Sequence, residues 1–140
     1  MSTPTDVAGL LDTSAVLLIP DLPADATLPS DPFISTVTLA ELAVRPLVAR
    51  DESERARRQT QVDRAQIDFD VLPFDAAAAL VFGRVSASYR RTGRKRAARA
   101  YDALIAATAI ANDLPLYTCN PRDFDGIDGL DVRTVPLPRA

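Results

Sequence analysis

The sequence predicts an α/β fold, a three-layer α/β/α sandwich with a mainly parallel central sheet. Short apolar runs of strand length alternate with longer helical patterns, which is typical of a parallel sheet covered by helices on both faces. The length of 140 residues is enough for one hydrophobic core and too short for two. We therefore expect a single domain over residues 1–140, with residues 1–6 and 137–140 as flexible tails.

The first predicted strand and helix meet at an aspartate. The apolar run over residues 7–11 predicts a buried strand, which ends at Asp12. Residues 15–19 are again apolar and predict a short helix after that turn. Four prolines within residues 20–32 indicate an irregular connection to the next element.

A second strand and two helices follow this connection. The strand is expected over residues 33–37, and Thr38 opens a helix in which Thr38 and Glu41 have the spacing of a capping box. Pro46 should kink this helix or end its regular part. Residues 51–66 are dense in glutamate and arginine and predict a solvent-exposed helix.

The second half of the chain continues the same alternation. Asp75 caps a long helical pattern that ends at Gly93. A second helix over residues 98–111 is apolar on almost every side, so we expect it to be buried. A turn over residues 119–124 precedes the last strand. The strands of this half are expected at residues 69–72, 114–118 and 132–135.

The composition excludes several catalytic mechanisms. The chain has no histidine, and Cys119 is its single cysteine. Ser-His-Asp and Cys-His catalysis are therefore excluded, as is a zinc site built on imidazole or on paired thiolates. A single cysteine also cannot close a disulfide within the chain, which fits a reducing compartment.

No targeting or membrane-spanning segment is expected. The residues before Val7 include no lysine or arginine, and Asp12 interrupts the apolar stretch that follows. No run approaches the ~18 apolar residues of a transmembrane helix. The sequence therefore predicts a cytoplasmic protein.

Basic residues are concentrated in one stretch of a chain whose formal net charge is −3. Between Asp75 and Asp102 there is no acidic residue. The cationic side chains of this stretch are Arg84, Arg90, Arg91, Arg94, Lys95, Arg96 and Arg99. Clustered cations attract a polyanion, so we expect Arg94, Arg96 and Arg99 to contact the backbone of a nucleic acid. The stretch fits a solvated face or a contact with an acidic partner protein equally well.

Four carboxylates are expected at one edge of the sheet. Asp12 follows the first strand, and Asp123 follows the strand that ends at Thr118. Glu41 and Asp102 lie near the starts of two helices. Because the sites of α/β folds lie beyond the carboxyl ends of the strands, we expect these side chains to converge there.

Each of these carboxylates also has a purely structural interpretation. Asp12 fits a helix N-cap, and Glu41 fits the reciprocal member of a capping box. Asp102 fits a first-turn acid favoured by the helix dipole, and Asp123 an ordinary turn residue. Asp102 differs from the others because it lies among apolar residues, where an ionised carboxylate is costly unless it is paired or binds a cation.

Converging carboxylates predict a cation. They repel one another and raise each other's pKa unless a positive charge compensates. Oxygen ligands without histidine or thiolate favour Mg²⁺, with Mn²⁺ as the alternative. Magnesium is commonly held by one or two carboxylates together with a substrate phosphate, so the sequence predicts metal-assisted phosphoryl chemistry.

Four segments of the chain resemble, in order and spacing, the motifs of PIN-domain ribonucleases, and more narrowly those of VapC-type toxins from bacterial toxin–antitoxin pairs. The segments are LLDTSA at 10–15, TLAEL at 38–42, YDALIAATA at 101–109 and TCNPRDF at 118–124. The resemblance implies a magnesium-dependent endoribonuclease that inhibits translation. It also implies a compact PIN-like fold, frequent homodimers, and a small cognate antitoxin whose C-terminal segment enters the active-site groove.

Residue by residue, the resemblance makes Asp12 and Asp102 the principal magnesium ligands, with Glu41 completing the acidic cluster. The fourth motif departs in part, because many relatives carry an acid where Asn120 stands. This departure leaves open whether Asp123 supplies that charge or only supports the ligands.

Two other functions share part of this pattern with a ribonuclease. An aspartyl-nucleophile phosphatase also places an aspartate after its first strand, but it usually has a second one two residues on, where this chain has Ser14. A partner-binding or receiver-like module is the non-enzymatic alternative. Receiver domains typically bear adjacent acids at the first strand and a lysine near the last, whereas Lys95 lies within the arginine-rich stretch.

Overall fold

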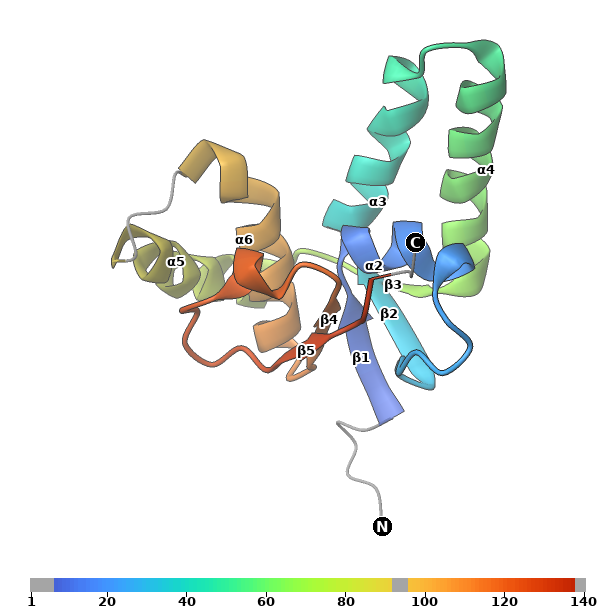
Figure 1. The fold of residues 1–140 in the computed structure, drawn as a ribbon. Coiled ribbons are helices and arrows are strands. Elements are labelled where there is room, and N and C mark those ends of the chain that lie inside the picture. Colours follow the sequence, from blue (N-terminus) through green and yellow to red (C-terminus); the bar gives the residue numbers. More distant parts are fainter. Residues whose placement is uncertain (1–6, 92–95, 138–140) are drawn as a thin grey trace.

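The computed structural model describes residues 7–91 and 96–137, with only the backbone for residues 96–99. Within these residues five strands form one parallel sheet in the order β3-β2-β1-β4-β5 (Figure 1). The strands are β1 Ala8–Leu11, β2 Asp31–Ser35, β3 Asp70–Leu72, β4 Leu116–Thr118 and β5 Val132–Thr134. All carboxyl ends therefore meet at one edge of the sheet, as the sequence predicted.

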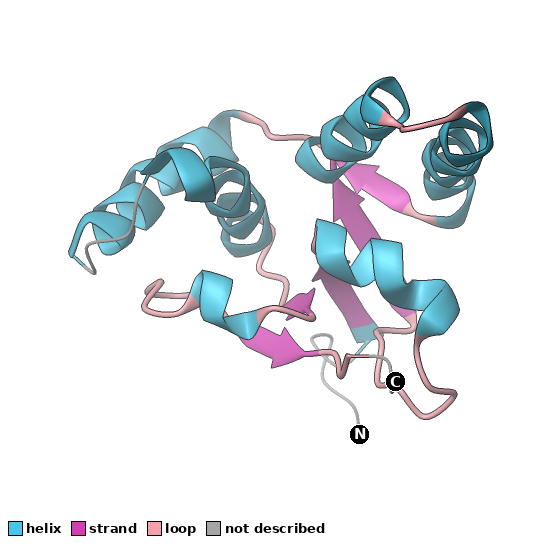
Figure 2. Cartoon of the chain, turned by 45° about the horizontal axis from the view of Figure 1, so that its top comes forward, coloured by secondary structure: helices cyan, strands magenta, loops and turns pink. Residues whose placement is uncertain are grey.

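The described residues form five α-helices and three short 3₁₀ helices. The α-helices are α2 Thr13–Leu18, α3 Thr36–Val44, α4 Glu52–Asp68, α5 Ala76–Arg91 and α6 Arg96–Ala111. The 3₁₀ helices are η1 Ile19–Asp21, η2 Arg45–Val48 and η3 Pro121–Phe124. Figure 2 shows α5 and α6 on one side of the sheet and α2, α3 and α4 on the other.

Two apolar clusters confirm the three-layer prediction. Leu10 and Leu11 are adjacent in β1 and both buried, but they belong to different clusters because successive strand residues point to opposite faces. The Leu10 cluster includes Val85 of α5 and residues of α6, and the Leu11 cluster includes Leu42 of α3 and Val62 of α4. In the part of α6 whose side chains are described, Ala103 and residues 105–109 are buried, as the sequence predicted.

The start of α3 corrects the expected capping box. We expected a strand over residues 33–37 and a helix from Thr38, but β2 ends at Ser35 and α3 begins at Thr36. Ser35 is the N-cap, since its Oγ accepts a hydrogen bond of 3.0 Å from the backbone N–H of Thr38. Thr38 is therefore the third helical residue, and Glu41 lies too far into the helix to cap it.

The other helix ends follow their sequence signals. Helix α3 ends at Val44, and Pro46 lies in the first turn of η2, as expected of a residue without an amide hydrogen. Asp75 accepts a hydrogen bond from the backbone N–H of Ala78 at 3.0 Å and so caps α5. Gly93, the predicted end of that helix, lies outside the described residues.

In the part of the chain that the structure describes, no helix is long and apolar enough to cross a membrane.

The strand order reverses direction between β1 and β4. The chain passes from β1 through α2 to β2 on one side, and it later returns through α5 and α6 to β4 on the other side. Parallel α/β sheets bind their ligands where the strand order reverses in this way. The carboxyl ends of β1 and β4 are therefore the expected position of the site.

Candidate active site

Asp12 lies at the carboxyl end of β1 and is 4% exposed. Its Oδ1 accepts hydrogen bonds from the backbone N–H of Ala15 at 2.9 Å and from the hydroxyl of Ser14 at 2.7 Å. Its Oδ2 accepts one from the hydroxyl of Thr118 at 2.5 Å. Asp12 is therefore the N-cap of α2, as its structural interpretation predicts. The capping bond from the Ala15 amide uses only Oδ1, one of the two carboxylate oxygens.

Burial raises the pKa of Asp12 above its ordinary value of 3.8, although the donors Thr118, Ala15 and Ser14 act in the opposite direction. The negative charge of Asp123 raises the pKa of Asp12 further. No arginine or lysine among the described side chains forms an ion pair with Asp12. Among the described side chains, this buried carboxylate is thus held by neutral donors.

Two hydroxyl residues hold Asp12 between β1 and β4. Thr118 at the end of β4 is fully buried, and its Oγ1 accepts a hydrogen bond of 2.9 Å from the backbone N–H of Asn120. Ser14 Oγ lies 3.4 Å from Thr118 Oγ1 and accepts a bond from the backbone N–H of Cys119. The sequence reasoning missed the role of Thr118. The signal was present, because a hydroxyl residue ends β4 at the same edge where Asp12 ends β1.

Glu41 projects from α3 toward the same edge and is half-buried. The hydroxyl of Thr13 donates a hydrogen bond of 2.7 Å to Glu41 Oε1 and lies 3.1 Å from Thr38 Oγ1. Burial raises the pKa of Glu41, and the charge of Asp12 adds to that increase. Glu41 is therefore electrostatically coupled to Asp12.

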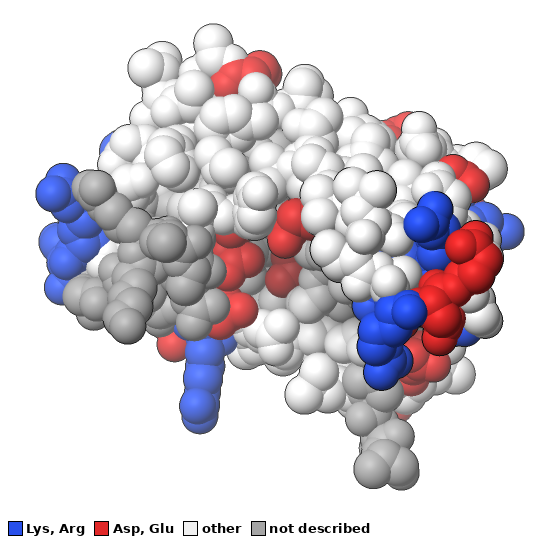
Figure 3. Space-filling view, turned by 90° about the horizontal axis from the view of Figure 1, so that it is seen from above, with Lys and Arg blue, Asp and Glu red and all other residues white. Residues whose placement is uncertain are grey.

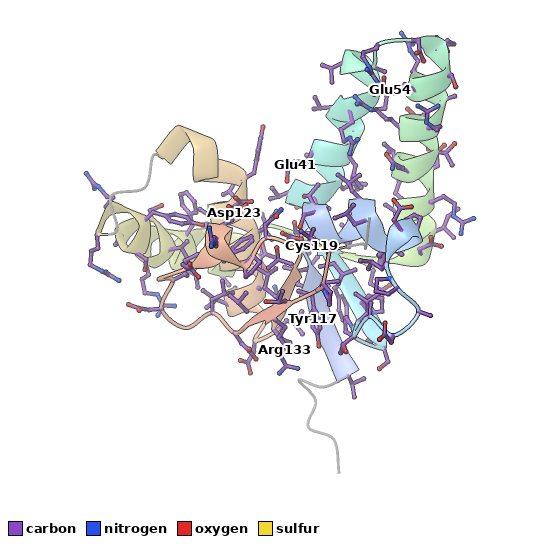
Figure 4. The ribbon with its side chains drawn as sticks, in the orientation of Figure 1. Glu41, Glu54, Tyr117, Cys119, Asp123 and Arg133 are labelled. Carbon is purple, nitrogen blue, oxygen red and sulfur yellow. The ribbon has the colours of Figure 1, made fainter. Side chains whose placement is uncertain are left out.

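Asp123 lies in η3, which follows β4. In Figure 4 it lies on the α6 side of the site, and Glu41 of α3 lies on the other side. The backbone carbonyl of Asp123 accepts a hydrogen bond of 3.0 Å from the hydroxyl of Tyr89 in α5, which fixes the position of η3. Asn120 is exposed at the start of this turn. The negative charge of Asp123 raises the pKa of Asp12, so the two carboxylates are electrostatically coupled.

Asp102 lies in the second turn of α6, which begins at Arg96. The interpretation of Asp102 as a first-turn acid is therefore wrong, because the helix extends further toward its N-terminus than the sequence indicated. Asp102 is half-buried, and its neighbour Ala103 belongs to the same apolar cluster as Val37 of α3. Helix α6 packs against both α3 and η3, the elements that carry Glu41 and Asp123.

Acidic side chains gather near the middle of the face formed by the carboxyl ends of the strands, in a hollow between the α5–α6 and α3–α4 pairs (Figure 3).

The structure does not describe the side chains of the three arginines that were expected beside this hollow. Arg94 lies outside the described residues, and Arg96 and Arg99 are described by their backbone alone, at the start of α6. Of the remaining basic stretch, Arg84 and Arg90 are exposed on α5, and Arg91 pairs with Asp128 at 2.9 Å.

The acidic cluster fits a hard cation by its donor chemistry. Its ligands are carboxylate and hydroxyl oxygens, and its buried carboxylate has no cationic partner among the described side chains. In the described part of the chain, no three acidic, cysteine or histidine side chains lie close enough together to hold a metal ion by themselves. Magnesium does not require one, because it keeps several waters and commonly takes one or two carboxylates from the protein.

The chain matches the PIN domain family over residues 10–130. It is 35% identical over 131 residues to Ribonuclease VapC5 of Mycobacterium tuberculosis, a match that covers 92% of this chain and 93% of the relative. It is 32% identical over 105 residues to Ribonuclease VapC of Rickettsia bellii, covering 75% of this chain and 77% of the relative.

Solved structures agree with these matches. The crystal structure of a VapBC-family toxin–antitoxin member, VapBC-5 of M. tuberculosis, superposes with a TM-score of 0.74 and 32% identity, over 94% of this chain and 99% of that one. DNA-bound VapBC of Salmonella typhimurium has a TM-score of 0.74 and 26% identity, over 91% of this chain and 98% of that one.

Proposed function

Because this chain belongs to the PIN-domain family and is a VapC-type ribonuclease toxin, we propose that it is a magnesium-dependent endoribonuclease that hydrolyses RNA phosphodiesters with water and thereby inhibits translation. The observation that carries the proposal is Asp12, a buried carboxylate with a raised pKa, no cationic partner among the described side chains and charge coupling to Glu41 and Asp123. Such a carboxylate is costly to bury unless a cation binds it.

We assign Asp12 and Asp102 as the principal residues that would hold Mg²⁺, with Glu41 completing the acidic cluster around it and Mn²⁺ as a substitute metal. When bound, the metal supplies charge stabilisation at the phosphate and lowers the pKa of a bound water. Asp12 contributes a carboxylate whose orientation is set by hydrogen bonds from β4 and α2. The hydroxyls of Ser14 and Thr118 therefore position Asp12 rather than react themselves.

Glu41 and Asp123 are the groups that can accept a proton from the attacking water. Neither is fully buried, so each can exchange its proton with solvent. The raised pKa of Glu41 makes its carboxylate a stronger base than an ordinary glutamate. Because water is the nucleophile, the absence of histidine from the chain is no obstacle to this reaction.

Arginines hold the RNA backbone in this proposal, and we assign Arg94, Arg96 and Arg99 to that role from their position in the sequence just before Asp102. The partners are an RNA substrate, a small cognate antitoxin protein and a second copy of the chain in a homodimer. The structural relatives that are VapBC toxin–antitoxin complexes support the antitoxin. We place the protein in the cytoplasm, where translated RNA is available.

One relative supports a proposal on the substrate class. This relative, from Shigella flexneri, is named a tRNA(fMet)-specific endonuclease and is 35% identical over 98 residues, covering 69% of this chain and 70% of the relative. We therefore propose structured RNA of the translation machinery as the substrate. Mapping the cleavage sites on total RNA tests this choice.

The decisive experiment measures RNA cleavage with Mg²⁺ and with EDTA. We expect EDTA to abolish cleavage, and Asp12→Asn and Asp102→Asn each to lower the rate by at least roughly a thousandfold without unfolding the protein. Glu52→Gln, at an exposed position of α4, is the matched control and should keep full activity. Full cleavage in EDTA would overturn the proposal, and binding of RNA or antitoxin without metal-dependent cleavage would favour a binding module.

The geometry gives no support to the phosphatase alternative. Ser14 stands where such enzymes carry a second aspartate, and its hydroxyl is turned back onto Asp12 Oδ1 at 2.7 Å. Thr118 occupies the other oxygen of Asp12. A carboxylate held on both oxygens in this way is poorly placed to attack a phosphate in line.

A further inference from the structure

Tyr101 differs from every other aromatic residue of the chain. The chain has five phenylalanines, three tyrosines and no tryptophan. All eight rings lie in the described residues, and seven of them are buried or partly buried. Tyr101 is 58% exposed. Packing therefore accounts for seven of the rings, whereas the ring of Tyr101 is largely open to solvent among the described residues.

Tyr101 is adjacent in the sequence to Asp102, one of the acidic residues assigned to the site. Tyr101 directly precedes Asp102 on α6, and successive helical residues are separated by about 100° around the helix axis. Asp102 is half-buried and Ala103 is in the core, so Tyr101 and Ala100 form the solvent face of this turn. The N-terminal half of α6 projects beyond the carboxyl ends of the strands (Figure 1).

We propose that Tyr101 is a stacking platform for one unpaired base of the RNA, next to the phosphodiester held at the acidic cluster. The proposal rests on the proposed ribonuclease function and adds a specificity-determining residue to it. Aromatic rings bind unpaired bases by stacking, and a base within an intact duplex cannot present its face in this way. Tyr101 would thus make the enzyme select RNA whose scissile bond lies next to an unstacked nucleotide.

The chemistry around the ring fits a nucleotide. The sequence places Arg96 and Arg99 within five residues of Tyr101, and interleaved cationic and aromatic side chains are typical of single-strand RNA contacts. The acidic hollow itself takes the phosphate only with a cation present. A base stacked on Tyr101 would help to hold the RNA at that hollow without adding negative charge to it.

Cleavage kinetics on a short single-stranded RNA test this role. We expect Tyr101→Ala to raise KM about tenfold, within the range measured for one stacked base, and to change kcat by less than about twofold. Tyr101→Phe keeps the ring and should retain the wild-type KM. Ile67→Ala, at a 79% exposed position near the end of α4, is the matched control and should change neither constant.

A KM for Tyr101→Ala within twofold of wild type would overturn the stacking role while leaving the ribonuclease function intact. If the wild-type protein itself cleaves no RNA in Mg²⁺, the proposed function fails instead. The two failures are therefore distinguishable in one series of assays.

A binding measurement separates RNA from a protein partner at this residue. Because the chain has no tryptophan, Tyr101→Trp introduces a single fluorophore at the proposed platform. With Mg²⁺ present and the acidic cluster intact, we expect a short single-stranded RNA with hydrolysis-resistant linkages to quench this fluorescence and a blunt RNA duplex with the same linkages to leave it unchanged. Ile67→Trp under the same conditions should respond to neither.

Equal quenching by the duplex, or no response to either RNA, would overturn the proposal. A response to the cognate antitoxin in place of RNA would also overturn it, and would assign Tyr101 to a protein interface.

Discussion

Two buried carboxylates of this protein, Asp12 and Glu54, have opposite environments. Asp12 at the edge of the sheet is 4% exposed, and Glu54 near the start of α4 is 8% exposed. Burial raises the pKa of Asp12, whereas hydrogen bonds and charges from Arg50 and Arg58 lower the pKa of Glu54. Two carboxylates of similar exposure therefore have pKa values shifted in opposite directions, and the described difference between them is the pair of arginines at Glu54.

The partners of Glu54 show what a structural carboxylate looks like in this fold. Its Oε2 accepts hydrogen bonds from the backbone N–H and from the Nε of Arg50, at 3.2 and 3.1 Å. Its Oε1 pairs with Arg58, which also donates to the carbonyl of Arg45 at 2.9 Å. Glu54 thus joins α4 to η2 and to the segment between them, and both of its oxygens face guanidinium groups.

Asp12 is hydrogen-bonded on both oxygens as well, but among the described side chains its donors are neutral. Two hydroxyls and one amide orient its oxygens, and the charge of Asp123 raises its pKa. Glu54, by contrast, has two arginine partners. The contrast supports the proposal that a bound cation supplies positive charge at Asp12.

The largest effect that separates the two regions is expected from matched glutamate variants. Glu41→Gln removes a charge from the acidic cluster, and we expect RNA cleavage to fall 10- to 100-fold, the usual effect of altering a group that tunes a metal site. Glu54→Gln removes a charge of the α3–α4 pair and should leave the cleavage rate unchanged. Initial rates at saturating Mg²⁺ and equal protein concentration make the comparison. Equal loss in both variants would mean that Glu41, too, is only structural.

A smaller effect is expected from the hydroxyl that holds Asp12. Thr118→Val keeps the shape of a fully buried side chain, but it removes the donor to Asp12 Oδ2 and the acceptor for the amide of Asn120. We expect cleavage to fall on the order of tenfold. Thr118→Ser keeps the hydroxyl and is the control. Positioning of Asp12 by Thr118 is contradicted if the valine variant is as active as the serine variant.

The smallest expected effect is on the pH dependence of folding stability in the absence of metal. Asp12 and Glu54 should change this stability in opposite directions. The folded-state pKa of Asp12 lies above its unfolded value of 3.8, so the folded protein loses stability as the pH rises through that interval. Asp12→Asn should therefore become increasingly stable relative to wild type from about pH 4 upward. The folded-state pKa of Glu54 is lowered, so its contribution is present above 4.5 and is lost as the pH falls through the folded value.

Thermal unfolding in EDTA between acidic and neutral pH measures both differences. The deficit of Glu54→Gln relative to wild type should shrink toward low pH, while the advantage of Asp12→Asn should shrink in the same direction. A deficit of Asp12→Asn that grows toward neutral pH would show that the Asp12 charge stabilises the metal-free fold, against this account.

Much of the fold was predictable because each element carries a local signal. Alternation of apolar runs and helical patterns predicted the parallel sheet, and Asp75 and Pro46 marked helix boundaries that the structure confirms. The error at β2 has a physical cause. Ser35 and Thr38 are both acceptable N-caps, and the choice between them depends on where β2 leaves the sheet beside β3, which is a tertiary contact.

Of the candidate site, the sequence indicated the acids but not the hydrogen bonds that orient them. Asp12 stands at the end of a strand, and the order of the motifs indicated that Glu41, Asp102 and Asp123 belong with it. The bond from Thr13 to Glu41 and the bond from Thr118 to Asp12 join residues 28 and 106 positions apart. No local pattern contains such pairs, because they depend on the register of the strands and on the packing of α2 against α3.

Thermal unfolding across a Mg²⁺ titration tests the central claim most directly, because a ligand that binds only the folded state raises its stability. The account predicts that the Tm of wild type and of Glu54→Gln rises by the same amount with Mg²⁺, and that the Tm of Asp12→Asn does not respond. A Mg²⁺ response that survives in Asp12→Asn, or one that is lost in Glu54→Gln, would contradict the assignment of the metal to the acidic cluster at the carboxyl edge of the sheet.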